Sequence, residues 1–593
     1  MKNKANRWIV LLVSGLIFGS CRPGTDGPGA ISSTALTAGH EEAEAWAEKT
    51  LASLSLERKV GQMICEQVRG EYVPEDDAGF LKILALIREY GVGALVVYGG
   101  SPHETASLLN RLQQESELPL LVSSDFEGGP GQQITGATEF PANMALSAAG
   151  SDDLAYELGK AGAAEGRAIG IHVTYSPVVD IQTRPDNPVL SVRSFGRDID
   201  LLGRMAGAYI RGYQDNGMLA TAKHFPGRGD VELIAGTEFT INNKSAEAVE
   251  AEDFQAFKKA IEAGVTYVMS EHISIPSVTG GSDLPASVEK ALATDWLRNR
   301  LGFQGILTTD DMWYEKVVDR FGAVEACIMA VEAGHDAILK PADSAAVIRG
   351  LVEAVRAGRI DAGRIDYSVK KILYWKARLN LHRNRFVDVE RIPSVVGIKA
   401  HQDLAARIAD QSITLLKNDG IVPVNPSKLA GTVHISIQKR ETDPAPAAVA
   451  AKLAAAFPGI RSYFLGPYTS GERHTEALEA AKKADLVLIS LFSQRTTYID
   501  NGPLRKRDLE FLGRVIESKP ASTLVMSYGN PYLAESMKNA AALVIGYGEG
   551  GFYGNQIIYA DSLIKLLKGE IKPRGRLPVG VSASFPVGSG IVD

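Results

Sequence analysis

Short β-rich apolar runs alternate with amphipathic helical stretches between residues 60 and 340, and this alternation constrains the fold more than any other feature. Eight of these runs predict strands, and each is followed by a helix-like stretch. Eight strand–helix units over about 280 residues match the size of a (β/α)8 barrel. Periodicity alone leaves a doubly wound open sheet as the alternative. The predicted strands are residues 63–66, 92–98, 120–125, 172–180, 220–224, 267–272, 305–310 and 337–340.

Side chains that can carry chemistry stand at the ends of six predicted strands. In a barrel all these ends meet at one face, which is where barrel enzymes place their sites, whereas in an open sheet only a few could meet. The sequence therefore favours the barrel. The residues are Glu66, Asp125, Asp180, Lys223 with His224, Glu271 with His272, and Asp310.

A chain of 593 residues is too long for a single compact core, so we expect a second domain after the barrel. Five further apolar runs with helices between them predict an αβα sandwich. These runs cover residues 433–437, 462–465, 486–492, 524–528 and 543–547. We place the barrel at residues 41–385, a linker at 386–410 and the sandwich at 411–593.

The N-terminus has the features of an export sequence. Three basic residues precede an apolar stretch at 8–18, and Gly19 and Ser20 then lead to Cys21. A Cys in this place resembles a bacterial lipoprotein signal, which implies a signal peptide at 1–21 and lipidation of Cys21. Residues 22–40 would form a flexible tether, because they are rich in small residues. An ordinary signal peptide with an incidental Cys is the alternative.

Composition argues against several classes of function. The formal net charge of -7 does not suit a nucleic-acid partner. Three cysteines cannot form a disulfide framework, and no C-x-x-C or H-E-x-x-H pattern offers a zinc site. The Gly-Gly-Pro-Gly run at 128–131 lacks the Lys-Ser/Thr of a phosphate-binding loop. We therefore expect no metal, nucleotide or redox cofactor.

The most specific motif follows the fifth predicted strand. It reads Lys-His-Phe-Pro-Gly-Arg-Gly-Asp from Lys223 to Asp230. Lys223 and His224 can donate hydrogen bonds to sugar hydroxyls, and the Pro-Gly-x-Gly run forces a tight turn directly after them. The motif resembles the K-H-F-P-G-H-G-D signature of glycoside hydrolase family 3, especially its bacterial β-N-acetylglucosaminidases of NagZ type.

Further motifs of that family follow in the same order along most of the chain. They include counterparts of its D-x-E-G-G turn, A-P-V-x-D strand, R-S-F-G segment and S-D-D strand end, and of three segments of its C-terminal domain. In this sequence they lie at 125–129, 176–180, 193–196, 309–311, 412–418, 530–532 and 573–578. The resemblance implies a barrel followed by an αβα sandwich, and a retaining glycosidase without a cofactor.

The resemblance also implies roles for individual residues. Asp310 corresponds to the catalytic nucleophile, and a strand-end carboxylate beside cationic donors would indeed stay ionised and able to attack an anomeric carbon. Its neighbour Asp311 would point elsewhere, because adjacent strand residues alternate sides. The positions that bind the hydroxyls of the sugar at the cleavage point are Asp125, Arg193, Lys223 and His224.

The sequence departs from the family in two places, at the acid/base and at an Arg that would contact substrate. NagZ-type enzymes follow this motif with an Asp-His pair, but those positions are Ile234 and Gly236 here. Asp230, Glu232 and Glu238 are the local substitutes, and Glu232 is our first candidate because its loop can reach the glycosidic oxygen. Related β-glucosidases take a Glu from the second domain, but none here lies in a matching motif. The family's E-G-G-R also becomes E-G-G-P at 127–130.

Together these features predict an exported, lipid-anchored glycosidase of the cell envelope. Its partner would be a carbohydrate with a terminal β-linked sugar, most simply an N-acetylglucosaminide from a glycan or peptidoglycan. A β-glucosidase or β-xylosidase of the same family is one alternative. A carbohydrate-binding protein that has lost turnover is another, although Asp310 argues against it. The sequence leaves the oligomeric state open.

Overall fold

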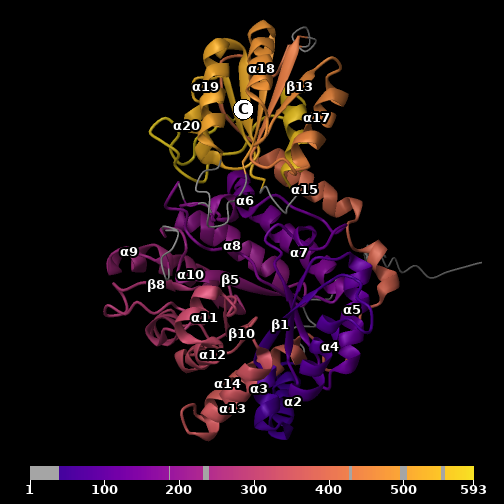
Figure 1. Ribbon diagram of the computed structural model, residues 1–593, viewed down its shortest axis with the longest axis vertical. Helices are drawn as coiled ribbons and strands as arrows, with labels where there is room; N and C mark the ends of the chain where they lie inside the picture. Colours follow the sequence, from indigo (N-terminus) through magenta and orange to yellow (C-terminus); the bar gives the residue numbers. More distant parts are fainter. Residues whose placement is uncertain are drawn as a thin grey trace, which may run out of the picture.

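The computed structural model describes residues 39–185, 187, 189–231, 240–425, 431–493, 504–548 and 555–592. Two domains follow one another along the long axis of the molecule, an indigo-to-salmon barrel below and an orange-to-yellow sandwich above (Figure 1). The predicted signal peptide with Cys21 lies outside the described residues. Among the residues described, no helix has the length and apolar character needed to cross a membrane.

The first domain is built on eight parallel strands in the order β10-β1-β2-β3-β4-β5-β7-β9. A parallel bridge between Thr308 and Ala337 joins β9 to β10, so the sheet closes on itself. This confirms the predicted barrel over the open sheet, with a strand at each of the eight predicted places. The strands are β1 (Ile64–Arg69), β2 (Ala94–Tyr98), β3 (Leu121–Ser124), β4 (Val173–Thr174), β5 (Leu219–Phe225), β7 (Tyr267–Ser270), β9 (Ile306–Thr309) and β10 (Ile338–Leu339).

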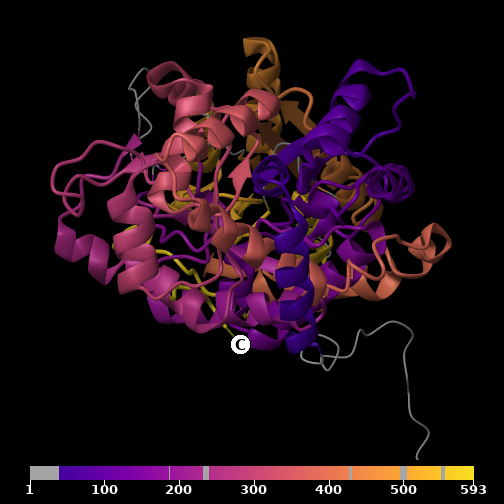
Figure 2. The same cartoon turned by 90° about the horizontal axis from the view of Figure 1, so that it is seen from below.

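Helices surround the barrel, which Figure 2 shows in front of the sandwich. All seven residues of β5 are buried, as expected for a parallel strand covered on both faces. In α8 (Ile199–Gln214) the buried Leu202, Met205, Tyr209 and Tyr213 follow a helical spacing and face the core. Besides short 3-10 turns, the other helices described in this domain are α2 (His40–Ser53), α3 (Leu56–Gln62), α4 (Ala78–Ala85), the π-helix η1 (Leu86–Tyr90), α5 (Pro102–Glu115), α6 (Asn143–Ala149), α7 (Asp152–Ile169), α9 (Ala246–Ala251), α10 (Asp253–Glu262), the π-helix η4 (Ala291–Arg300), α11 (Glu315–Phe321), α12 (Ala323–Ala333), α13 (Ser344–Arg356) and α14 (Ala362–Arg378).

The second domain has a six-stranded sheet in the order β11-β16-β15-β14-β12-β13. The sequence predicted five strands. The sixth is the edge strand β11 (Thr414–Asn418), which pairs antiparallel with β16 and contains a bulge. Two of its five residues are buried, so it lacks the continuous apolar run of the inner strands. The others are β12 (Thr432–Gln438), β13 (Arg461–Leu465), β14 (Leu486–Phe492), β15 (Thr523–Ser527) and β16 (Ala542–Ile545).

Helices cover both faces of this sheet and complete the αβα sandwich (Figure 1). One group packs together on one face and consists of α18 (Gly471–Lys483), α19 (Lys506–Ser518) and α20 (Ala534–Met537). The other group consists of α15 (Lys399–Ser412), α17 (Ala445–Ala456) and α21 (Ile558–Lys568).

The two domains are joined by packing and by backbone hydrogen bonds. Helix α15 packs against α6 and α7 of the barrel as well as α21 of the sandwich. The amide of Ala142 donates to the Tyr547 carbonyl at 3.1 Å, and that of Arg197 donates to the Pro578 carbonyl at 3.1 Å. The predicted linker at 386–410 contains the 3-10 helix η5 (Val389–Ser394) and most of α15. The second domain is therefore fixed beside the segment that carries Arg193.

Candidate active site

A small cavity opens at the carboxyl ends of the barrel strands. Its volume is ≈ 240 Å³, which suits one small polar ligand rather than a polymer. Charged side chains of both signs line it together with a few aromatic and apolar ones. The lining residues are Tyr98, Asp125, Glu127, Gln132, Tyr175, Arg193, Lys223, His224, Arg228, Thr240, Met269, Glu271, His272, Asp310, Asp311, Tyr314 and Leu339.

Asp310 directly follows β9 and is partly buried at the cavity wall. Its Oδ1 accepts a 2.7 Å hydrogen bond from the Asp311 amide. Burial alone would raise the pKa of Asp310, but the charges of His272 and Arg228 hold it below its usual value. The neighbouring Asp311 is bound by Lys340, whose Nζ lies 2.7 Å from its Oδ2. Asp310 is therefore the ionised carboxylate of the pair that remains available to a ligand.

A buried charge network forms the next part of the wall. Arg193 donates two 2.7 Å hydrogen bonds, one to each carboxylate oxygen of Glu127. The ammonium of Lys223 lies 2.7 Å from Asp125 and 2.8 Å from Glu127. Burial would lower the pKa of Lys223, but Asp125 and Glu127 raise it, so the ammonium stays charged. This network offers both donors and acceptors to a ligand with several hydroxyls.

His224 is held by a carboxylate behind the cavity. Its Nδ1 lies 2.7 Å from Oδ2 of Asp180, which fixes the orientation of the ring. Asp180 also accepts a 2.7 Å hydrogen bond from the Arg228 amide. Burial raises the pKa of Asp180 to about 7 in spite of these amide donors. Asp180 thus orients His224 and does not line the cavity itself.

The glycines after β5 allow Arg228 to turn back toward the cavity. Gly227 has a φ of 128°, which other residues rarely adopt. A Cβ at Gly229 would collide with the carbonyl oxygen of Ile181. The resulting tight turn places Nη2 of Arg228 2.8 Å from Oε2 of Glu271.

The structure brings together five of the predicted site residues, Asp125, Arg193, Lys223, His224 and Asp310, around one cavity. Glu232 and Glu238 lie outside the described residues, so the predicted acid/base role of Glu232 stays a prediction. Asp230 is described and accepts a 3.0 Å hydrogen bond from Thr183, but it is not part of the cavity wall.

Of the six strand ends expected to converge, four contribute to the cavity and two do not. Asp180 lies behind His224, and Glu66 accepts a 2.6 Å hydrogen bond from Ser344 outside the cavity. Sequence reasoning missed the role of Glu127, although this residue stands in the quoted D-x-E-G-G motif. Only its pairing with Arg193, 66 positions away, shows its function in the site.

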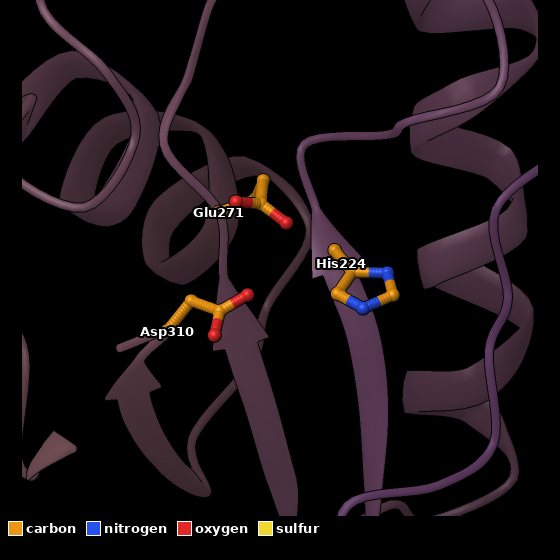
Figure 3. Close-up of side chains that lie close together, drawn as sticks. All are labelled: His224, Glu271 and Asp310. Atoms are coloured by element: carbon orange, nitrogen blue, oxygen red, sulfur yellow. The ribbon is translucent and has the colours of Figure 1, made fainter. Parts of the chain in front are cut away.

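Three side chains in the cavity also form a donor set that a metal ion can use. His224, Glu271 and Asp310 each place one donor atom within 4.8 Å of the others (Figure 3). Arg228 already pairs with Glu271, and Lys223 stands on the same wall. Since cationic side chains already supply positive charge here, the residues fit a neutral polar ligand better than a divalent cation.

Comparisons with known proteins agree with this geometry. The chain is 28% identical over 553 residues to a β-N-acetylglucosaminidase/β-glucosidase from Cellulomonas fimi, with 90% of this chain and 95% of the relative covered. The solved β-glucoside phosphorylase BglX, bound to 2FGlc, superimposes with a TM-score of 0.79 and 26% identity, covering 92% of this chain and 98% of that one.

A family 3 β-N-acetylglucosaminidase from Paenibacillus sp. str. FPU-7 superimposes with a TM-score of 0.77 and 27% identity, covering 89% of this chain and 99% of the other. The model of the glycosyl hydrolase family 3 N-terminal domain matches residues 55–374, which is more than half of the chain. The barrel, the cavity at its carboxyl ends and this match have one explanation: the chain belongs to glycoside hydrolase family 3.

Proposed function

We propose that this protein hydrolyses terminal β-linked N-acetylglucosaminides with retention of configuration. The observation that carries the proposal is Asp310, an ionised carboxylate that faces a small cavity rich in hydrogen-bonding side chains. The names of the relatives from Cellulomonas fimi and Paenibacillus support this sugar.

The residues around the cavity suggest how the reaction proceeds. Lys223, His224 and Asp125 bind the hydroxyls of the terminal sugar, and Arg193 is held rigidly by Glu127. Asp310 attacks the anomeric carbon while the leaving group departs, and a glycosyl ester forms. Water then attacks the same carbon and releases Asp310, so two inversions give net retention. Charged groups that are fixed before substrate binds need little reorganisation during the reaction.

A β-glucoside is the second candidate substrate, because the Cellulomonas fimi relative is named for both sugars and BglX for β-glucosides. We would measure release of nitrophenol from β-N-acetylglucosaminide, β-glucoside and β-xyloside substrates, with and without phosphate. The proposal predicts fastest release from the N-acetylglucosaminide and a free sugar as product. A sugar phosphate would instead indicate phosphorolysis. Binding of the sugar without any turnover would identify a binding protein.

We further propose that the protein is exported and anchored in the cell envelope by a lipid on Cys21. The order of basic residues, apolar stretch and Gly-Ser-Cys supports this location. Cys21→Ala should abolish incorporation of labelled fatty acid and release the protein from membrane fractions. Unchanged membrane retention of the variant would contradict the lipid anchor.

A further inference from the structure

Glu271 and Asp310 both adjoin Ser270, the last residue of β7, one through the chain and the other through a hydrogen bond. Glu271 follows Ser270, the last residue of β7, and its amide donates to the Phe225 carbonyl at 2.7 Å. The amide of Asp310 donates to the carbonyl of Ser270 at 2.8 Å. The barrel register therefore sets the distance between the two carboxylates, without help from a long loop.

Both carboxylates face the same space. Glu271 is 5% exposed and belongs to the cavity wall. One of its carboxylate oxygens lies within 4.8 Å of a carboxylate oxygen of Asp310. In Figure 3 the two side chains converge opposite the ring of His224.

We propose that Glu271 is the general acid and base of the glycosidase reaction. The inference rests on the proposed function, in which Asp310 is the nucleophile. A pair of carboxylates about 5 Å apart is the arrangement that retaining glycosidases use, with one as nucleophile and the other as proton donor. Glu271 thus fills the role for which the sequence offered no Asp-His pair.

The charges around Glu271 and Asp310 suit the two carboxyl groups to different roles in the reaction. Burial raises the pKa of Glu271, and the charge of Asp310 raises it further, against the opposing charges of Arg228 and His272. The pKa of Asp310 is lowered. Two neighbouring carboxyl groups whose pKa values are moved apart can serve as acid and nucleophile at one pH. Arg228, 2.8 Å from Oε2, fixes the orientation of the Glu271 carboxyl group.

Asp310, Glu271 and water account for every bond and proton in the formation and hydrolysis of the glycosyl ester. In the first, the carboxylate of Asp310 forms a bond to the anomeric carbon, the bond from that carbon to the glycosidic oxygen breaks, and the proton of Glu271 passes to that oxygen. In the second, Glu271 takes a proton from water as the water oxygen bonds to the anomeric carbon. The bond to Asp310 breaks, and both carboxyl groups return to their starting states.

A purely structural role predicts different behaviour. If Glu271 served only to hold Arg228, its replacement would disturb the cavity equally for every substrate. A general acid matters most for a leaving group that cannot depart without a proton. The dependence on leaving group therefore separates the two roles.

The test compares the wild type with Glu271→Gln on a dinitrophenyl glycoside and on the methyl glycoside of the same sugar. We expect kcat/KM to fall by about 10²–10⁴-fold on the methyl glycoside and by less than about tenfold on the activated one. Azide should then accelerate the variant on the activated substrate and give a β-glycosyl azide, because azide needs no base. Glu271→Asp, which keeps a carboxyl group, should recover part of the activity on the methyl glycoside.

Glu66→Gln provides the matched control, because it makes the same change at another buried glutamate, within β1 and outside the cavity. Its kcat/KM should stay within about twofold of the wild type on both substrates. Equal losses on both substrates in Glu271→Gln, without a glycosyl azide, would overturn the inference and return the role to a loop carboxylate such as Glu232. If Glu271→Gln failed to fold, an equal loss of kcat/KM on both substrates in Glu271→Asp would overturn the inference as well. A wild type that cleaves neither substrate would overturn the proposed function itself.

Discussion

The two ends of the barrel both bury charged side chains, but they do so in different ways. At the amino end, Asp336 precedes β10 and lies 2.6 Å from Arg298, 3.2 Å from Lys371 and 3.5 Å from Arg364. Burial alone would raise the pKa of Asp336, but these three cations lower it to about 2. Its carboxylate is thus surrounded by permanent partners.

At the carboxyl end the same kinds of residue surround an opening. Asp310 and Glu271 line a cavity of ≈ 240 Å³, and their pKa values are shifted in opposite directions. Buried charge alone therefore does not mark a reactive site. A carboxylate becomes available for chemistry where its protein partners leave one side of it facing a cavity.

The largest expected effect is the loss of turnover in Asp310→Asn. Removal of a nucleophile typically costs about 10⁵–10⁶-fold in kcat, while an amide of the same shape preserves the cavity. Steady-state kinetics and thermal unfolding would be measured on the same preparation. A folded variant that kept more than a hundredth of the wild-type rate would contradict the role of Asp310.

Asp336→Asn makes the same chemical change at the opposite end of the barrel. We expect the free energy of unfolding to fall by about 3–5 kcal/mol, because three partly buried cations lose their buried carboxylate. The kcat of the folded variant should stay near the wild-type value. Urea unfolding and kinetics at a temperature where the variant is folded would check this. A large loss of kcat would show that the two ends are not separate in function.

Arg193→Lys tests whether rigid positioning matters at the carboxyl end. Lysine keeps the charge but cannot make the two parallel hydrogen bonds to Glu127, so kcat/KM should fall by about 10²-fold. Arg204→Lys is the control, because Arg204 forms an exposed ion pair with Asp152. The control should change little. Similar activity in both variants would mean that the pair with Glu127 is only structural.

The smallest expected effect concerns acid stability at the amino end. The pKa of Asp336 is lower in the folded chain, so its stabilisation is complete above pH 4 and is lost as the pH falls through about 2. The difference in unfolding free energy between the wild type and Asp336→Asn should therefore be about 1 kcal/mol smaller at pH 3 than at pH 7. Urea unfolding at both pH values measures it. A difference that does not change with pH would contradict the lowered pKa.

The barrel was predictable because each strand contains a short apolar run, and helical stretches separate the eight strands. In β5 the run Leu219–Ala222 precedes the polar residues Lys223 and His224, and all seven residues are buried. The edge strand β11 was missed since it is bulged and its last three residues are only partly buried, two of them being the polar Lys417 and Asn418. The run predicted at 172–180 contains only the two-residue strand β4, because beyond Thr174 the segment pairs with β5 through a single bridge, between Val178 and Lys223.

The candidate site was predictable where a residue stands at a strand end. Asp125, Lys223, His224 and Asp310 were found in this way, and all line the cavity. Contacts between distant parts of the chain carry no such pattern. The pairing of Glu127 with Arg193 and the approach of Glu271 to Asp310 follow from barrel closure and register, which the sequence alone does not display.

Covalent trapping tests most directly the claim that Asp310 is the nucleophile at the open end of the barrel. The protein would be incubated with a slow 2-fluoro glycoside, digested and examined by mass spectrometry. We expect one sugar adduct per chain, on the side chain of Asp310, and none in Asp310→Asn. An adduct on Asp311, or turnover of the probe through an inverted product without any adduct, would contradict it.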